Sequence, residues 1–296
     1  MTSSQERRRV LITGAAGNAG SVVARMALDA GFDVRMADIA PPADHDLRGA
    51  EFFRCDTRTA SDVDRAVRGC DAVVHLAAWH CAHEPPVSDE TIFAVNVDGT
   101  FNVVQACRRY GVSSVVFASS MAYGWGSVYG VTKVIGEDLW RMYHEVTGAS
   151  VVQLRYHDFV PKQYLAWGSM LLRNGVDRRD VASATVAALR GVVDHKVDLF
   201  RTIVHTNHAM PDEVAKDFAS KGRDWCEERV PGSAALLDRY EIALPAQVEQ
   251  HDLTEAERLL DWKPRYGIVE FLTDLQRRDA RGEDVRSLWA PGQTPD

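Results

Sequence analysis

Residues 9–20 read RVLITGAAGNAG, in which a short apolar run ends in a turn that carries three glycines. Residues 21–30 then place apolar side chains at helical spacing, so a strand, a turn and a helix are predicted in succession. Gly14, Gly17 and Gly20 would let the backbone turn tightly and let a pyrophosphate approach the amides at the start of the helix. This arrangement is typical of dinucleotide-binding proteins.

The alternation of apolar strands with helical patterns continues through the first half of the chain. It predicts an α/β fold, a doubly wound parallel sheet of Rossmann type. Strands are predicted at 9–13, 33–38, 51–56, 71–78, 115–119, 151–155 and 199–205, and helices at 88–110, 129–147, 178–190, 211–228 and 253–262. We expect an NAD-binding domain over 1–155 and a smaller substrate-binding lobe over 156–296, interleaved with it and ending in a frayed tail from about Arg278.

Composition narrows the class of protein. The 296 residues carry a net charge of -8, so no overall field draws the surface to nucleic acid or to anionic lipid. The longest uncharged stretch, Gly111 to Thr132, is rich in serine and glycine, and it predicts a buried strand and loop and no membrane span. The five cysteines form no CxxC pair, which favours a reducing, cytoplasmic setting over a disulfide framework.

Asp38 lies at the predicted end of the second strand, 18 residues after Gly20. A carboxylate at this position can accept hydrogen bonds from both ribose hydroxyls of NAD, and its charge would repel the 2′-phosphate of NADP. NAD is therefore the predicted cofactor. Arg35, on the same face of the strand, is the residue that could instead bind a phosphate.

Tyr129 and Lys133 stand four residues apart at the start of a predicted helix, so the ammonium group lies close to the phenol. A neighbouring cation favours the phenolate and lowers the pKa of the tyrosine, as a general base requires. Ser119 and Ser120 end the preceding strand and could place a hydroxyl beside the phenol. The apolar residues predicted to face the core from this helix are Val131, Val134, Ile135, Leu139, Met142 and Val146.

Taken together, these residues resemble the extended short-chain dehydrogenases/reductases, the NAD-dependent epimerase/dehydratase family. The motifs that carry the resemblance are TGAAGNAG (13–20), Asp38, Asp56, HLAA (75–78), NVDGTFNVVQAC (96–107), FASS (117–120), YGVTKVIGE (129–137), VDRRDVASATVAAL (176–189) and LLDWKP (259–264). They occur in the family's order along nearly the whole chain.

The resemblance implies a role for each matching residue. The catalytic residues would be Tyr129 as base, Lys133 on the nicotinamide ribose, and one of two serines, Ser120 in preference to Ser119. The cofactor-binding set would also include Gly14, Gly17, Asn18, Ala19, Gly20, Asp38, Asp56, Leu76, Ala77, Ala78 and Asn96. The segment from Ser120 to Tyr129 is shorter than is usual in the family, which predicts a more open substrate mouth.

Residues 79–84 read WHCAHE and concentrate side chains that can bind a metal ion. No second cluster has matching spacing, so we expect no metal site. His80 and His83 either contact the substrate or are ordinary surface residues. His205 and His208 either face the pocket or are structural. Three arginines also have two interpretations. They either clamp an anionic substrate or form ordinary salt bridges: Arg173, Arg178 and Arg179.

The expected function is hydride transfer at a carbinol carbon of a sugar, sugar acid or nucleotide-sugar, with Tyr129 as the base. The short C-terminal lobe favours a small, unlinked sugar or sugar acid, as in uronate dehydrogenases. One alternative is a nucleotide-sugar epimerase, which returns the hydride to its substrate. Another is a catalytically silent, NAD-binding regulator. The resemblance also implies a homodimer formed through the helix that bears Tyr129.

Overall fold

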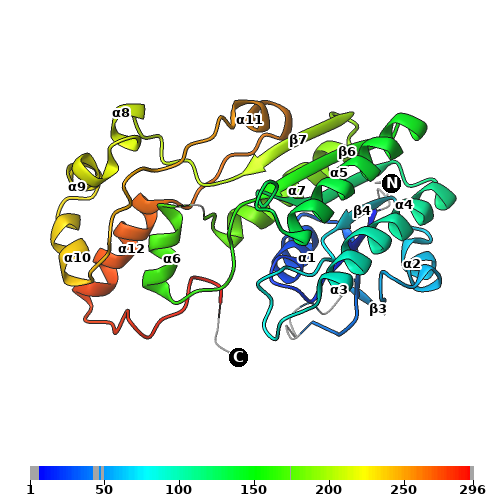
Figure 1. The fold of residues 1–296 in the computed structure, drawn as a ribbon, viewed down its shortest axis with the longest axis horizontal. Coiled ribbons are helices and arrows are strands. Elements are labelled where there is room, and N and C mark those ends of the chain that lie inside the picture. The colour runs from blue at the N-terminus through cyan, green and yellow to red at the C-terminus, as the bar shows by residue number, and fades with distance from the viewer. Residues whose placement is uncertain (1–6, 43–46, 48–49, 174, 294–296) are drawn as a thin grey trace, which may run out of the picture. The chain divides into compact units, whose positions relative to one another are not determined.

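The computed structural model describes residues 7–42, 47, 50–173 and 175–293, and the chain divides into two compact units (Figure 1). The first unit contains residues 1–156, 182–203 and 254–262, and the second contains 157–181, 204–253 and 263–296. The chain therefore passes between the units several times. The first segment of the first unit ends one residue after the boundary predicted at 155.

The first unit is built on one seven-stranded sheet with the order β3-β2-β1-β4-β5-β6-β7. Its strands are β1 (Arg9–Thr13), β2 (Asp33–Asp38), β3 (Glu51–Arg54), β4 (Ala72–His75), β5 (Ser114–Ser120), β6 (Ser150–Tyr156) and β7 (Leu199–Val204). β1 pairs in parallel with both β2 and β4, and the remaining registers from β3 to β6 are parallel as well. The direction of winding reverses between β1 and β4, so the predicted doubly wound fold is confirmed.

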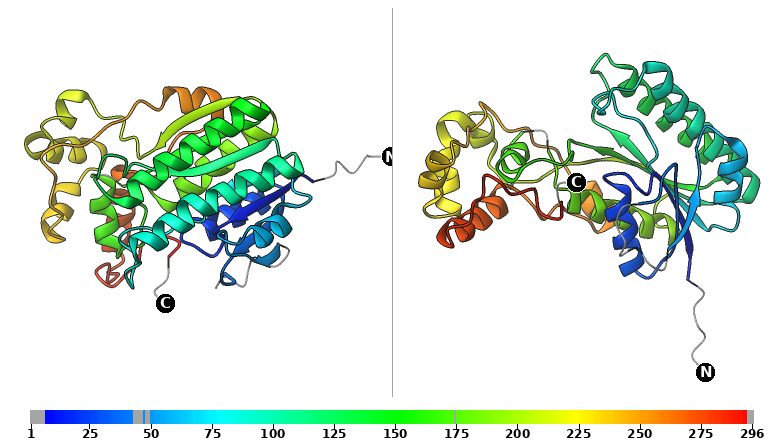
Figure 2. Two further views of the ribbon diagram at one scale, coloured as in Figure 1. Left: turned by 45° about the vertical axis from the view of Figure 1, so that its right-hand side comes forward. Right: turned by 90° about the horizontal axis from the view of Figure 1, so that it is seen from below.

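Helices cover both faces of this sheet. They are α1 (Gly20–Asp29), α2 (Ala60–Val67), α3 (Asp89–Phe93), the π-helix η1 (Ala94–Asp98), α4 (Gly99–Tyr110), α5 (Val128–Thr147), α7 (Arg178–Val193) and α11 (Thr254–Leu260). Figure 2 shows α1 on the face opposite to α4 and α5. On the latter face, Val73, Val115 and Val151 pack against side chains of α2, α4 and α5 in one buried cluster that includes Trp140. Strands buried on both faces need continuous apolar runs, and the central strands β1 and β4 have them.

The face that α5 turns to the sheet matches the predicted one only in part: Leu139 and Met142 pack partly buried against the core, and three predicted valines do not. Val131, Val134 and Val146 are exposed, with 57%, 38% and 59% of their surface accessible. The buried positions of the helix are instead Tyr129, Gly130, Thr132, Lys133, Gly136, Glu137, Trp140 and Tyr143. A side chain at position 136 would place its Cβ 2.5 Å from the ring of Phe117, so glycine permits this close approach. Small and polar residues therefore face inward together with Trp140 and Tyr143, and the three valines face outward.

The second unit has its own core. Its helices are α6 (Tyr164–Leu171), α8 (Asp212–Ala215), α9 (Phe218–Arg229), α10 (Ser233–Arg239) and α12 (Ile268–Ala280). Tyr164, Trp167 and Phe271 form an aromatic cluster with ring centroids 5.3 to 5.7 Å apart. Aromatic contacts at this spacing add to the stabilisation that burial provides. This core extends to Val285 and Ala290 near the C-terminal end of the described chain.

Three predicted elements differ from the structure. The helix predicted over 88–110 is interrupted by the π-helical turn η1, and the one predicted over 211–228 is divided between α8 and α9. The tail predicted to fray from Arg278 continues as helix to Ala280. Beyond it, Ala290 donates its backbone N–H to Lys162 at 2.9 Å. Burial of apolar side chains in this tail accounts for its order, and residues 294–296 lie outside the described part.

A buried carboxylate fixes α5 to the sheet. Glu137 Oε1 accepts hydrogen bonds from Ser119 Oγ at 2.6 Å and from Arg155 Nε at 2.7 Å. Its Oε2 accepts from Arg155 Nη2 at 2.7 Å and from Arg201 Nη1 at 3.0 Å. Burial acts to raise the pKa of Glu137, but the hydrogen bonds from Arg155 and Ser119 and the two positive charges lower it overall. One side chain of α5 is thereby tied to β5, β6 and β7.

Replacing Glu137 with Gln is expected to lower the free energy of unfolding by about 3 kcal/mol at pH 7, because two guanidinium groups lose their buried partner. A carboxylate whose folded pKa is lowered stabilises the fold above its ordinary pKa and ceases to do so as pH falls. The difference between wild type and variant should therefore narrow below about pH 4.5. Urea unfolding at pH 7 and pH 4 measures both effects.

The matched control is Glu145→Gln on the exposed side of the same helix, where the carboxylate pairs with Arg141. It should change the free energy of unfolding by less than about 1 kcal/mol. Equal effects of the two substitutions would contradict the role given to Glu137.

Candidate active site

The glycine turn after β1 is packed too closely for side chains. Gly14 has a φ of +68°, and a Cβ there would lie 2.7 Å from the backbone nitrogen of Ala77. A Cβ at Gly20 would lie 2.0 Å from the carbonyl oxygen of Gly14 and 2.6 Å from Ala15 Cα. Glycine at 14 and 20 therefore lets the turn, the loop after β4 and the first turn of α1 pack together.

The start of α1 has the features of an anion-binding helix end. Its N-cap residue, Ala19, has no side chain that could accept a hydrogen bond from the first amides, and no acidic residue stands in the first turn. The neighbouring Gly17 and Asn18 are exposed. The amides of the first turn and the positive end of the helix dipole can therefore meet a phosphate group.

Asp38 at the end of β2 joins the glycine turn to the second strand. Its Oδ2 accepts the backbone N–H of Ala16 at 2.9 Å, and its Oδ1 accepts that of Ile39 at 2.7 Å. Arg35 is buried, and its guanidinium donates to Glu51 and to the carbonyl of Ala66. Arg35 is thus committed to structural partners and does not serve as a phosphate ligand in this arrangement.

A buried chain of hydrogen bonds runs from β1 through β4 to the π-helical turn. Thr13 Oγ1 is 2.7 Å from His75 Nδ1, and His75 Nε2 is 3.0 Å from Thr100 Oγ1. Thr100 donates to the carbonyl of Asn96 at 2.6 Å, and the Ala77 amide donates to Thr13 Oγ1 at 3.3 Å. Burial lowers the pKa of His75 to about 3, so this histidine is a neutral structural link. Leu76, Ala77 and Ala78 follow it directly along the edge of the sheet.

Asn96 connects the loop after β4 to α5. Its Oδ1 accepts the Trp79 amide at 2.8 Å, while its Nδ2 donates to the Trp79 carbonyl and to Thr132 Oγ1, both at 3.0 Å. Asn96 lies within η1, and π-helical turns of this kind occur often at functional sites. The sequence indicated Asn96 but not the π-turn, which leaves no clear mark in residue spacing.

Asp56 follows β3 and stands at the surface of the same unit. Its carboxylate accepts hydrogen bonds from the Arg58 side chain, the shortest at 2.6 Å, and from the Arg58 amide at 3.0 Å. The hydrogen bond from Arg58 is the main cause that lowers the pKa of Asp56. The carboxylate is therefore held ionised by a near neighbour in the chain.

Ser119 and Ser120 both end β5, but their hydroxyl groups have different partners. Ser119 donates to Glu137, as described above. Ser120 Oγ accepts the Ala122 amide at 3.1 Å and is hydrogen-bonded to the Tyr129 side chain. Of the two serines, Ser120 is the one beside Tyr129, and its catalytic role stays a prediction.

Tyr129 and Lys133 lie in the first two turns of α5 and face the end of β5. The helix begins where Ser127 Oγ accepts the Gly130 amide. Lys133 Nζ donates to the Ala118 carbonyl at 2.9 Å and lies 5.7 Å from the centre of the Tyr129 ring. Both side chains are nine-tenths or more buried. The predicted pair is thus brought together on one helix face.

Burial dominates the electrostatics of this pair. It raises the pKa of Tyr129 to about 12, although the hydrogen bond with Ser120 acts in the opposite direction. Burial also lowers the pKa of Lys133 to about 8. The prediction that Tyr129 has a lowered pKa is therefore wrong for this structure. Loss of water around the phenol outweighs the attraction of an ammonium group that is itself hydrogen-bonded to a carbonyl.

The metal-capable segment after β4 is engaged in local contacts. His80 Nδ1 accepts the Ala82 amide at 3.0 Å, and its ring lies 4.3 Å from the ring of Tyr129. The His83 ring packs edge-on against Trp79, also at 4.3 Å. His80 thus borders the tyrosine, and Trp79 packs against the small buried cluster that contains it.

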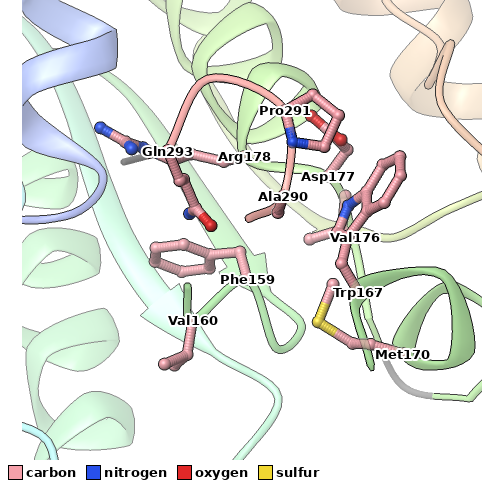
Figure 3. A pocket seen from close by; sticks show the side chains of 10 residues that line it. All are labelled: Phe159, Val160, Trp167, Met170, Val176, Asp177, Arg178, Ala290, Pro291 and Gln293. Atoms are coloured by element: carbon pink, nitrogen blue, oxygen red, sulfur yellow. The ribbon is translucent and has the colours of Figure 1, made fainter. Parts of the chain in front are cut away.

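The second unit contains a small pocket (Figure 3). Phe159, Trp167 and Met170 supply apolar walls, and the side-chain amide of Gln293 lies beside the Phe159 ring. Arg178, one of the three arginines predicted to clamp an anionic substrate, borders this pocket and donates to the Gly292 carbonyl at 3.4 Å. This lining suits a mostly apolar group with one or two polar atoms.

Arg179, a second arginine of the predicted clamp, has a structural environment. Arg179 Nε donates to Asp177 Oδ1 at 2.8 Å, and its guanidinium lies 3.4 Å from the centre of the Tyr266 ring. Stacking and pairing of this kind fix the guanidinium in place. For Arg179, the salt-bridge interpretation therefore describes the structure.

Comparison with known proteins links these features to one family. Residues 10–163 match the model of the NAD dependent epimerase/dehydratase family. A uronate dehydrogenase of Pseudomonas putida is 30% identical over 170 residues, which cover 52% of this chain and 62% of that protein. An L-arabinose 1-dehydrogenase (NAD(P)(+)) of Haloferax volcanii is 31% identical over 176 residues, or 50% of this chain and 65% of the relative. The match thus spans less than two thirds of either relative.

Solved structures share the fold. A short-chain dehydrogenase/reductase superfamily protein from Agrobacterium tumefaciens, crystallised with bound NAD, superposes with a TM-score of 0.68 at 20% identity. The superposition covers 93% of this chain and 98% of that one. In the part of this chain that the structure describes, there is no helix long and apolar enough to cross a membrane.

The free energy of unfolding of the wild type is expected to rise between about pH 8 and pH 10.5. Replacing Lys133 with Met should abolish this rise. Because burial lowers the folded pKa to about 8, the unfolded chain binds more protons than the folded chain across that window, and wild-type stability increases with pH. The whole shift corresponds to about 3 kcal/mol. Urea unfolding at pH 7 and pH 10 measures the slope.

Lys196→Met, at an exposed lysine paired with Asp194, is the control and should keep the wild-type slope. The assignment of Lys133 as a buried titrating group fails if the Lys133→Met protein gains stability with pH as steeply as wild type does.

Proposed function

Because the chain belongs to the NAD dependent epimerase/dehydratase family, we propose that it is an NAD-dependent dehydrogenase acting at a carbinol carbon of a sugar or sugar acid. The observation that carries the proposal is the grouping of Ser120, Tyr129 and Lys133. The three side chains lie at the end of β5 and the start of α5, in the same unit as the glycine turn.

The residues of the turn fit NAD. Gly14 and Gly20 leave no room for side chains where the backbone approaches the phosphate position, and α1 begins without a side-chain cap. Asp38 presents a carboxylate at the end of β2, where it would accept the ribose hydroxyls. NAD when bound supplies the hydride acceptor.

Tyr129 would take the hydroxyl proton of the substrate while the C–H bond gives up its hydride. The phenol is hydrogen-bonded to Ser120, which would hold the substrate hydroxyl in line with it. Lys133 is the cation nearest to the phenol among the described contacts, and its charge favours the phenolate form. With a folded pKa near 12, the tyrosine gains basic character as pH rises, so oxidation should be faster at alkaline pH.

The substrate class follows from the relatives and from the size of the second unit. Both curated relatives quoted above are named as sugar or uronate dehydrogenases. The second unit is compact, which favours a small unlinked sugar or sugar acid. A nucleotide-sugar epimerase is the second candidate. The same three residues would support a reaction in which the hydride is first removed from the substrate and then returned to it.

We further propose a cytoplasmic homodimer that assembles through α4 and α5. Phe101 on α4 and Val131, Val134 and Val146 on α5 are exposed apolar residues on two helices that pack against each other. Covering such a patch favours association. Light scattering that gives the mass of a single chain would exclude the dimer.

Turnover should be lost in Tyr129→Phe, because the ring stays in place while the group that accepts the proton is gone. NAD binding, measured by quenching of tryptophan fluorescence, should stay within about threefold of wild type. Tyr110→Phe removes an exposed hydroxyl that contacts Arg68 and should leave the rate unchanged. Full activity in the Tyr129→Phe protein would end the assignment of the base.

Asp38→Asn is expected to shift cofactor preference toward NADP. The amide keeps the size of the side chain but removes the negative charge that repels a 2′-phosphate, and it accepts ribose hydroxyls less well. The ratio of kcat/KM with NAD to that with NADP should fall by at least about tenfold. An unchanged ratio would mean that Asp38 serves only to hold the Ala16 amide.

An absorbance screen for NADH across aldoses, uronic acids and nucleotide-sugars tests the reaction class. NADH accumulation with a uronic acid or aldose supports the dehydrogenase. Conversion of a nucleotide-sugar without net NADH identifies the epimerase. Tight NAD binding with no turnover of any member of the panel favours the catalytically silent regulator.

A further inference from the structure

Three histidines from separate parts of the chain meet in the second unit. His157 directly follows β6, His205 directly follows β7, and His251 lies in the loop that precedes α11. β6 and β7 are neighbours in the sheet, and the backbone N–H of His157 donates to the Val204 carbonyl at 3.2 Å. Strand pairing thus brings the first two histidines together, and the loop brings the third.

The spacing of their ring nitrogens is close to that of metal ligands. Nε2 of His157 is 3.1 Å from Nε2 of His251, and one nitrogen from each of the three rings lies within 4.8 Å of the others. In a tetrahedral zinc site with Zn–N bonds of about 2.0 to 2.1 Å, neighbouring nitrogens are about 3.3 Å apart. The first pair fits this spacing as it stands, and the third ring needs an inward shift of about 1.5 Å.

His205 requires an explanation that ordinary packing does not supply. Its side chain is fully buried, and neither ring nitrogen makes a hydrogen bond of normal geometry. A buried polar group without a partner costs about 1 to 3 kcal/mol, and most such groups in native proteins are paired. A hydrogen bond between His157 and His251 would satisfy one nitrogen of each, but apart from a contact with the Arg173 backbone it leaves His205 with no hydrogen bond of normal geometry.

The electrostatic environment keeps the rings in the form that metals bind. Burial, followed by the neighbouring histidines, lowers the pKa of His205 to about 2, and burial lowers the pKa of His251. Neutral imidazoles present a lone pair to a cation. Glu249 Oε1 lies 3.3 Å from His251 Nε2, so a negative charge stands beside the cluster. Glu249 lies outside the group of three donors whose ligand atoms are all within 4.8 Å of one another, so it is not part of the proposed ligand set.

We propose that His157, His205 and His251 together bind one divalent transition-metal ion, with Zn²⁺ as the representative ligand. Three imidazole nitrogens are the donors that zinc and its neighbours in the first transition row prefer, whereas Mg²⁺ and Ca²⁺ require oxygen ligands. The ion would tie the ends of β6 and β7 to the loop before α11. This site replaces the expectation of no metal, and it uses none of the residues assigned to hydride transfer.

Zinc titration of the full chain, prepared without a histidine tag and freed of metal by chelator, tests the proposal. Calorimetry should give one ion per chain, and replacing Zn²⁺ with Co²⁺ should give the visible absorption of a four-coordinate ion. His205→Gln and His251→Gln should each weaken zinc binding by more than about 100-fold, since even loss of a group behind a ligand costs 10–100-fold. Saturating zinc should raise the Tm of the wild type and not of these variants.

The control, His144→Gln, removes a histidine whose ring is hydrogen-bonded to the Ala149 carbonyl, and it should bind zinc as wild type does. Circular dichroism reports folding, and if His205→Gln does not fold, the partly exposed His251 supplies the deciding variant. Absence of stoichiometric binding, unchanged binding in the folded variants, or loss of binding in Cys81→Ser overturns the proposal. None of these measurements depends on turnover, so failure of the proposed dehydrogenase activity is scored separately.

Discussion

The buried contact between Glu137 and two arginines is the interaction on which the candidate active site depends. It joins α5 to β5, β6 and β7 through one carboxylate, because the Ser119 hydroxyl is its third partner beside the two arginines. A charge inside a protein is costly unless it is paired and hydrogen-bonded, so this arrangement is stable in one geometry only. That geometry sets the rotation of α5 about its axis, and the rotation determines that Tyr129 and Lys133 face the end of β5.

The rotation has an electrostatic consequence for the pair. Placing a phenol and an ammonium group against the sheet removes both from water, and each is thereby shifted toward its neutral form. Lys133 retains a carbonyl partner, whereas Tyr129 has a serine hydroxyl. The phenol and the ammonium group are therefore shielded from water. A charged ligand that enters the site would shift their pKa values more strongly than it would in water.

Local sequence patterns predicted the sheet, and they selected Ser120, Tyr129 and Lys133, which the structure brings close together. Both predictions depend on positions that few residue types can fill. The glycines at 14 and 20 fill positions where no Cβ fits, and the tyrosine and lysine lie one helical turn apart. The inward face of α5 was predicted only in part, since apolar spacing favoured Val131 and Val134, whereas the contacts of Glu137 with residues far away in the sequence turn that side of the helix toward the sheet. Contacts between residues far apart in the sequence, such as those of His157 with His251, leave no local pattern to find.

The hydrogen bonds of Asn96 connect the loop after β4 to α5. The Asn96 side-chain amide is hydrogen-bonded to both backbone groups of Trp79 and to Thr132 on α5, the helix that carries Tyr129. Asn96 therefore holds both the segment from Trp79 to Cys81 and the helix that carries Tyr129. A ligand that displaces residues 79–81 would therefore disturb the hydrogen bonds of Asn96, one of which holds α5. Ligand binding at this loop would thus be coupled mechanically to the position of Tyr129.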